Sequence, residues 1–336
     1  MKLITISIAA YNIEKYLEKT LNSLIHQELL DKIEVLIIDD GSIDNTSNIA
    51  KKFEKKYPNT FRYIAKENGG HGSTINKGME LATGKYFRVL DGDDYFNTEN
   101  FVKLIRALEN TQEDMVITNY LWVDDKGNSQ RHNHGVFSIL EHGTVYEFDN
   151  KFDASLFGLS TISIKTELLK KSNIKIREKC FYVDMEFVIW CIHLSDSFIF
   201  YNYDVYMYRC LGTADNSINK DNMIKNVKMQ ELVALDLIDF YTQQVESQNT
   251  SANKKKMILQ RIEQSIMATV RTYLLIRGRH EKRKFIIDFD NSIEKKSANI
   301  FGDLNQNRFM YLIRICNYKL ISIIGVCYKI YLYLKN

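Results

Sequence analysis

The sequence of 336 residues contains one proline, Pro58, and only 15 glycines. It therefore has no Pro-rich or Gly-rich linker and no low-complexity tract. Hydrophobic residues make up 45% of the chain and charged residues 26%, which is typical of a globular protein with a proper core. The net charge is only +3, and no basic stripe occurs in the first 200 residues, so we expect no nucleic-acid partner.

The chain also lacks the cysteine spacing of a zinc site. None of its five cysteines forms a C-x-x-C pair, and their scattered positions indicate free thiols in a reducing compartment. The N-terminus begins directly with an apolar strand pattern and shows no charged region, long apolar segment or cleavage site of a secretory signal. We therefore expect a cytoplasmic protein, either free or at the inner face of the membrane.

Strand-like and helix-like segments alternate through the first 125 residues. Short apolar runs, the first of them rich in β-branched residues, predict strands at 3–10, 33–40, 61–66, 85–91 and 114–125. The segments between them carry apolar residues at helical spacing and predict helices at 12–27, 42–57, 72–83 and 98–110. This alternation predicts an α/β fold with right-handed crossovers and a Rossmann-like, mainly parallel central sheet covered on both faces.

The pattern changes after residue 125. A polar loop and mixed segments lead to strand-like alternation at 199–210. Beyond this point helices are predicted at 221–245, 253–278 and 305–335, joined by charged connections. We therefore predict an α/β domain at 1–215 and an all-helical C-terminal region at 216–336, which would serve acceptor binding, oligomerisation or contact with a membrane surface.

The last predicted helix, 305–335, is strongly apolar and aromatic, but Arg314, Lys319 and Lys329 interrupt it. Its longest uninterrupted apolar run is far below the roughly 20 residues that a membrane span needs. Two alternatives remain open. The helix either packs on its own protein or a partner subunit, or lies in a membrane interface with its Tyr and Lys side chains at the lipid boundary.

Polar, acidic and glycine residues follow four of the predicted strands. Ligands of parallel sheets bind outside the carboxyl ends of the strands. Carboxylates gathered at such an edge repel one another and cost stability, so their convergence predicts a positively charged ligand. The motifs concerned are "AYN" at 10–12, "DDGS" at 39–42, "ENGGHG" at 67–72 and "DGDD" at 91–94.

The sequence Asp91-Gly92-Asp93 offers two hard oxygen ligands with a glycine between them that permits close approach. This pattern suits Mn²⁺ or Mg²⁺ shared with a phosphate-bearing ligand. An EF-hand is excluded by spacing, and no G-x-G-x-x-G follows the first strand. Tyr11 is placed to stack on a base, and Asp39 or Asp40 to accept the imide N–H of uracil.

Five motifs, "SIAAYN", "IIDDGSID", "NGG…INKG", "ATGKYFRVLDGDD" and "YVDMEF", occur in this order. Together they resemble the successive motifs of family-2 inverting glycosyltransferases of the GT-A fold, over about residues 1–215. The resemblance implies a nucleotide-diphosphate-sugar donor, preferably a UDP-sugar, a divalent metal at an Asp-x-Asp motif, and transfer with inversion. The sugar would be transferred to a hydroxyl of a glycan, of a lipid-linked molecule or of a protein-linked one. Such a reaction belongs to the synthesis of bacterial surface polysaccharide, teichoic acid or glycoprotein.

The resemblance also implies roles for single residues. Asn76 and Lys77 would border the donor, Asp91 would lie near the ribose or sugar, and Asp93 would bind the metal with Asp91. In "YVDMEF", Asp184 would be the catalytic base and Glu186 the alternative; the family's usual acidic residue before the base is Val183 here. By the same resemblance, the residues that would hold the nucleoside are Ala10, Tyr11, Asn12, Glu14, Asp39 and Asp40.

A later segment, "MYRCLGTADNS", resembles the loop that closes over the donor phosphates. Arg209 would pair with the diphosphate, and Ser217 would donate a hydrogen bond. Many relatives have a metal-binding histidine in this loop, and this chain has none, with Asp215 the nearest substitute. We expect the acceptor at residues 126–160 and the start of the helical region.

Two other functions remain as alternatives. A nucleotidyltransferase of related fold usually has a glycine-rich loop with Arg or Lys after the first strand, and "AAYNIEKY" is different. A non-catalytic scaffold could retain the fold and use its helical tail for assembly, but the intact Asp91, Asp93 and Asp184 argue against it.

Overall fold

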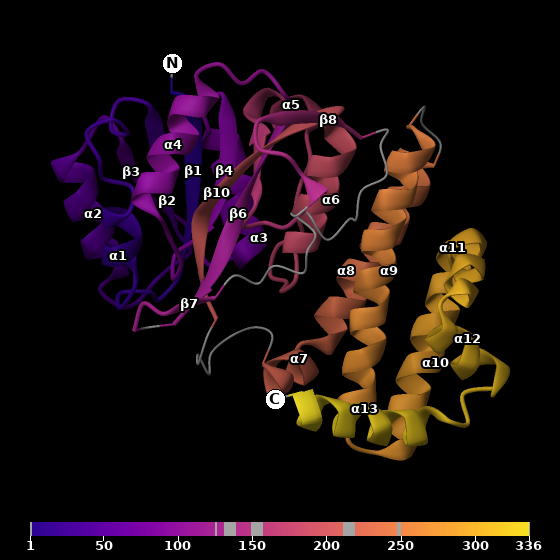
Figure 1. Cartoon of the computed structure of the whole chain (residues 1–336). Helices are drawn as coiled ribbons and strands as arrows, with labels where there is room; N and C mark the ends of the chain where they lie inside the picture. Colours follow the sequence, from indigo (N-terminus) through magenta and orange to yellow (C-terminus); the bar gives the residue numbers. More distant parts are fainter. Residues whose placement is uncertain are drawn as a thin grey trace. The chain divides into compact units, whose positions relative to one another are not determined.

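The computed structural model describes residues 2–124, 126–130, 139–148, 157–210, 219–246 and 250–335. The chain divides into two compact units, Met1–Ala214 and Asp215–Asn336 (Figure 1). The first unit is built around a sheet and the second is helical, so the predicted α/β domain followed by a helical region is confirmed as a fold class.

In the described part of the first unit the sheet has ten strands, and the longest of them pair in parallel. Along the sheet the order is β3-β2-β1-β4-β9-β6-β10-β5, with β7 paired to β6 and β8 to β10. The strands are β1 (Ile4–Ala10), β2 (Ile33–Asp39), β3 (Phe61–Ala65), β4 (Tyr86–Asp91), β5 (Tyr95–Phe96), β6 (Met115–Val123), β7 (Ser129–Gln130), β8 (Thr144–Glu147), β9 (Ile162–Lys165) and β10 (Ser197–Arg209). The β3-β2-β1-β4 block and the β6–β10 pair are parallel, and the short β9 runs antiparallel between β4 and β6.

Helices of the first unit connect these strands and bury its core. One cluster joins alternate side chains of β1 and β2, such as Ile6 and Val35, to Leu21 of α1 and Leu104 of α4. Helix α1 is shorter than predicted, because the chain after β1 first forms turns. The helices are α1 (Leu17–Asn22), α2 (Thr46–Lys56), α3 (His71–Leu81), α4 (Thr98–Leu108), α5 (Thr166–Ser172) and α6 (Asp184–Leu194).

The second unit contains helices throughout its described part. In α10, predicted as a charged connection, ten of 18 residues are charged, and these hid the buried stripe of Ile286, Phe289 and Ile293. The elements are α7 (Lys220–Lys225), α8 (Val227–Phe240), the π-helix η3 (Tyr241–Val245), α9 (Ala252–Leu275), α10 (Arg279–Lys296), α11 (Ala298–Asp303), the 3₁₀ turn η4 (Leu304–Gln306), α12 (Arg308–Ile315) and α13 (Ile321–Lys335).

The predicted helix 305–335 is divided in two. Asn317 and Tyr318 adopt positive φ angles of 48° and 59°, which turn the chain between α12 and α13. Among the described residues, no helix has both the length and the apolar character needed to cross a bilayer.

Candidate active site

Three strands end side by side at one edge of the sheet, and each carries a motif identified in the sequence. Ala10 of β1 is in register with Asp39 of β2, and Ala9 with Asp91 of β4. The chain stays close beyond the strand ends, because Asp40 N donates a hydrogen bond to Ala10 O at 2.8 Å. The parallel pairing therefore brings "AYN", "DDGS" and "DGDD" to one place.

A cavity of about 580 Å³ opens at this edge. The Tyr11 ring on its wall is 51% exposed, which leaves its face open for stacking. The cavity also takes in residues of α3 and of the loop before α6. Of the residues proposed from the sequence, it is lined by Ala10, Tyr11, Asp40, Asp91, Gly92 and Asp93.

Gly92 marks a close approach between two loops. Its N–H donates to Ala9 O at 3.0 Å. A Cβ added there would lie 2.6 Å from that oxygen and 2.2 Å from Cδ1 of Ile13. A larger residue would push the Asp91 and Asp93 carboxylates away from the end of β1.

Asn12 and Glu14 are not part of the cavity lining. The Asn12 Oδ1 accepts from Ile43 N at 2.9 Å, and its N–H donates to Ser42 Oγ at 3.0 Å. Glu14 Oε2 accepts from Asn45 N at 2.8 Å. Both residues therefore join the loop after β1, which carries Tyr11, to the loop after β2.

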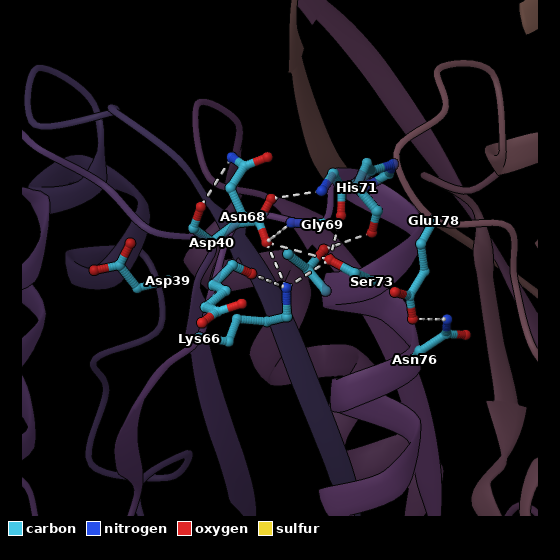
Figure 2. Close-up of polar contacts among 12 residues, drawn as sticks. Asp39, Asp40, Lys66, Asn68, Gly69, His71, Ser73, Asn76 and Glu178 are labelled. Atoms are coloured by element: carbon cyan, nitrogen blue, oxygen red, sulfur yellow. Dashed lines mark hydrogen bonds and ion pairs between the residues drawn. The ribbon is translucent and has the colours of Figure 1, made fainter.

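The Asp40 carboxylate holds the glycine loop that precedes α3 (Figure 2). It accepts from Gly69 N at 2.9 Å, Gly70 N at 2.8 Å, Lys66 Nζ at 2.6 Å and Ser73 Oγ at 3.2 Å. The lysine ion pair offsets its charge. Asp40 therefore shapes the cavity wall as well as lining it.

Asp39 lies behind that wall and is 3% exposed. Its Oδ1 accepts from Ser42 N at 2.8 Å, and its Oδ2 from the Tyr63 hydroxyl at 2.8 Å. Burial and this carboxylate raise the pKa of Tyr63 to about 12. Asp39 is not among the lining residues, so of the two aspartates in "DDGS" only Asp40 faces the cavity.

His71, the first residue of α3, contacts the acidic strand end directly. Its Nε2 lies 3.0 Å from Asp91 Oδ1. Burial alone would lower the pKa of His71, but Asp91 outweighs this effect, with smaller contributions from Asp184 and Asp93, so the pKa is raised. The influence of Asp184 shows that the start of α6 lies within electrostatic reach of the cavity.

Asp93 and Asp94 lie beside other carboxylates, with which they share an excess of negative charge. Burial raises the pKa of Asp93, and the Asp91 carboxylate raises it further. Burial, then Asp93 and Asp91, hold the pKa of Asp94 well above its usual range. The Asp94 carboxylate anchors β10, because it accepts from the Tyr206 hydroxyl and from Arg209 N, both at 2.7 Å.

Arg209 lies beside Asp93 but in a separate, smaller cavity of about 140 Å³. Its guanidinium carbon is 3.5 Å from the centroid of the Tyr16 ring. Lys15 and Lys19 line the same cavity, so positive charge gathers on this side of Asp93. The partner proposed with Arg209, Ser217, lies outside the described residues, as does Asp215.

Asn76 and Lys77 are both on α3, outside the cavity lining. Asn76 binds the chain before α6. Its Nδ2 donates to Glu178 Oε1 at 3.0 Å (Figure 2). The same Nδ2 donates to Ile176 O at 2.8 Å, and Oδ1 accepts from Ile176 N at 2.8 Å. Lys77 pairs with Glu80 at 2.8 Å on the helix surface.

The two candidate bases on α6 differ in environment. Asp184 is the first residue of the helix and is partly exposed. Glu186 is 7% exposed, and its Oε2 accepts from Arg177 N at 2.8 Å. Glu186 therefore supports the loop before α6, and Asp184 is the more accessible carboxylate.

The acidic strand end fits a divalent cation. Asp91 and Asp93 both line the cavity, and carboxylate oxygens are the ligands that Mg²⁺ and Mn²⁺ prefer. The raised pKa of Asp93 indicates that the protein alone does not balance their charge. Within the described ranges no three His, Cys, Asp or Glu side chains are grouped as metal ligands.

Sequence reasoning missed part of the cavity wall. His71 was given no role from the sequence, although it stands within the "ENGGHG" motif. Lys179, Cys180 and Phe181 complete the wall from a loop that the sequence places some 90 residues after the acidic motif. The expected acceptor region, 126–160, falls partly outside the described residues, at 131–138 and 149–156.

Comparison with known proteins identifies the family of this domain. The model for "Glycosyl transferase family 2" matches residues 5–171. Among curated proteins, the "Uncharacterized glycosyltransferase MG060 homolog" of Mycoplasma pneumoniae is 42% identical over 120 residues, which is 35% of this chain and 40% of that protein. The "Minor teichoic acid biosynthesis protein GgaB" of Bacillus subtilis is 28% identical over 172 residues, 51% of this chain and 19% of that protein. The chain thus spans less than half the length of these relatives.

A similar solved structure is S. aureus TarS 1-349 in complex with UDP-GlcNAc, with a TM-score of 0.57 and 20% identity. The similarity covers 88% of this chain and 91% of that one. At this identity the likeness shows a shared fold, and it extends into the helical unit.

Proposed function

Because residues 5–171 form a glycosyl transferase family 2 domain, we propose that this protein transfers a sugar from a nucleotide-diphosphate sugar, preferably a UDP-sugar, to an acceptor hydroxyl with inversion. The observation that carries the proposal is the cavity at the ends of β1 and β4. It combines an exposed aromatic ring, Tyr11, with the carboxylates of Asp91 and Asp93.

In this proposal the Tyr11 ring stacks on the base, and Asp40 accepts the imide N–H. A carboxylate oxygen accepts more than one hydrogen bond, so Asp40 can serve the base and the glycine loop together. Asp39 supports this wall from behind. The domain limits, 1–215 for donor binding and 216–336 for acceptor or surface contacts, belong to the same proposal.

Asp91 and Asp93 would hold a Mn²⁺ or Mg²⁺ ion. Such an ion supplies positive charge that offsets the charge developing on a diphosphate leaving group. Arg209 adds a fixed cation on the far side of Asp93. His71 holds Asp91 in place through its Nε2 contact at 3.0 Å.

Inversion requires a base that removes the proton of the acceptor hydroxyl on the face opposite the leaving group. We assign this role to Asp184, because it is the more accessible of the two α6 carboxylates and acts electrostatically on His71 at the cavity. Glu186 is engaged with the backbone of the loop before α6.

The proposed acceptor is a hydroxyl of a glycan, or of a lipid-linked or protein-linked precursor, of a bacterial cell-surface polymer. The transfer would take place in the cytoplasm. The name of the Bacillus subtilis relative GgaB, a teichoic acid biosynthesis protein, supports a surface polymer. The UDP-GlcNAc complex of TarS supports the choice of a UDP-sugar donor.

The test is a panel of nucleotide sugars incubated with the full chain and Mn²⁺ or Mg²⁺, with release of free nucleotide as the readout. We expect a UDP-sugar to be hydrolysed slowly without acceptor, and the reaction to stop with a chelator. Asp93→Asn should lower the rate at least a hundredfold. Asp31→Asn, an exposed carboxylate before β2, is the matched control and should not change it. Equal rates in both variants would overturn the proposal.

A further inference from the structure

The end of the chain carries an unusual amount of exposed apolar surface. Of the thirteen large hydrophobic side chains that are exposed among the described residues, seven lie between residues 311 and 330. Six aliphatic members of this set form what we call the apolar face: Leu312, Ile315, Leu320, Ile323, Val326 and Ile330. Surface of this kind marks contact with another apolar phase.

On α13 the apolar face points away from the rest of the helical unit. Ile321 is 1% exposed, and a Cβ added at Gly325 would lie 3.1 Å from Leu274 O of α9, so this side of the helix lies against the unit. With 3.6 residues per turn, Ile323, Val326 and Ile330 fall on the opposite side. These side chains therefore have no place in the core of their own unit.

A basic pocket of about 130 Å³ adjoins the start of α13. Arg283 reaches Asn317 O with Nη2 at 3.2 Å, while its Nε is buried and has no hydrogen-bond partner among the described residues. Glu281, the acidic residue in the first turn of α10, is not part of the lining. The basic pocket is lined by Arg279, His280, Arg283, Tyr318, Lys319 and Ser322.

The helical unit as a whole carries a net positive charge, as the basic pocket does. Residues 215–336 contain 20 lysines and arginines against 12 aspartates and glutamates, a formal charge of +8, whereas residues 1–214 carry −5. From Leu304 to Asn336 there is no acidic residue. Asp290, which lies next to this segment, is already bound by Arg314 at 2.6 Å and by the Tyr318 hydroxyl at 2.6 Å.

We propose that the apolar face and the basic pocket together dock on the surface of an anionic phospholipid bilayer. The aliphatic side chains enter the boundary of the acyl chains, and the pocket binds a lipid phosphate. Amphipathic helices bind membranes through this combination of apolar area and basic charge. The proposal is independent of the sugar-transfer chemistry, and of the two alternatives for the C-terminal helix it selects the membrane interface.

A second copy of the chain fits this face less well. In a two-fold interface the same patch meets itself. Two basic pockets would then face each other, and the segment 304–336 offers no carboxylate to pair with them. An anionic lipid surface supplies the missing negative charge.

The test is co-sedimentation of the full chain with vesicles of phosphatidylcholine alone, or with one third phosphatidylglycerol. We expect binding to the anionic vesicles only, weakened by salt. The double variant Ile323→Ser/Val326→Ser should reduce binding at least tenfold through lost apolar burial. Lys319→Ala and Arg279→Ala should each reduce it about fivefold.

Two control variants match these changes elsewhere on the same unit. Leu232→Ser removes an exposed apolar side chain from α8, and Lys295→Ala removes an exposed charge at the far end of α10. Both should bind vesicles like the unaltered chain. All the positions are exposed, and circular dichroism verifies that each variant is folded.

Three outcomes would overturn the proposal. The first is no binding to anionic vesicles, and the second is equal binding to neutral and anionic ones. The third is an oligomer in vesicle-free solution that Ile323→Ser/Val326→Ser converts to a monomer, which would assign the apolar face to a second copy of the chain.

Discussion

Asn76 and Ile176 hold each other by two reciprocal hydrogen bonds across 100 residues of sequence. The side-chain Nδ2 donates to the Ile176 carbonyl and the side-chain Oδ1 accepts from its N–H, both at 2.8 Å. This pair fixes the loop before α6 to α3. The same loop supplies Lys179, Cys180 and Phe181 to the cavity wall.

The first prediction concerns that loop. Asn76→Ala should lower the free energy of unfolding by about 1–3 kcal/mol, because two backbone groups lose their partner. It should also raise the KM for the donor as the cavity wall loosens. Urea denaturation and donor titration measure the two effects. The neighbouring Lys77→Ala removes only a surface ion pair and should change stability by less than about 0.5 kcal/mol. A larger donor effect at Lys77 than at Asn76 would contradict this account.

The second prediction concerns Gly92. Gly92→Ala places a Cβ 2.6 Å from the Ala9 carbonyl oxygen, which belongs to the backbone of β1 and cannot rotate away. We expect a loss of about 1–3 kcal/mol in stability and at least a tenfold loss of donor hydrolysis, measured by thermal unfolding and nucleotide release. Gly302→Ala on α11 meets no atom within 4 Å and is the control. If Gly92→Ala and Gly302→Ala have the same stability and the same rate of donor hydrolysis, the close approach at Gly92 does not matter for function.

The third prediction separates the two candidate bases. Asp184→Asn should lower kcat for transfer by about 10²–10⁴-fold, the usual contribution of a general base, with the donor KM little changed. Glu186→Gln should instead lower stability, because it weakens the hydrogen bond to Arg177 N. Steady-state kinetics and denaturation on the same samples distinguish them. A reversed pattern would move the base to Glu186.

The fourth prediction concerns pH and the far end of the sheet. Burial would raise the pKa of Asp114, but hydrogen bonds from Asp196 N and Lys165 Nζ, each at 2.9 Å, lower it below its usual value. Its carboxylate therefore stabilises the fold above the unfolded pKa, and this contribution is lost as pH falls through the lower folded pKa.

Asp114→Asn should accordingly cost about 1.5–3 kcal/mol at neutral pH, and the difference from the unaltered chain should shrink below about pH 4. Unfolding midpoints across the acid range test this. A difference that stays constant down to pH 2 would show that the carboxylate charge is not involved.

Local sequence was enough to predict the sheet edge. The strands β1 and β2 are apolar and rich in β-branched residues, and β4 is largely apolar and aromatic. Parallel pairing puts their carboxyl ends together, so "AYN", "DDGS" and "DGDD" had to meet. The helix α10 was missed because its charged residues obscure a buried stripe of three apolar positions. The break between α12 and α13 was missed because Asn317 and Tyr318 adopt positive φ without a glycine to signal it.

The site shows the same division at the level of single residues. The sequence by itself determined the chemistry of the cavity: a strand-end tyrosine, and two carboxylates separated by a glycine. Only the tertiary structure decided that Asp40 faces the cavity while Asp39 lies behind it, that His71 contacts Asp91, and that Asn76 holds a loop 100 residues away. The physical reason is that strand ends follow from local periodicity, whereas the partner of a side chain depends on contacts between segments far apart in the chain.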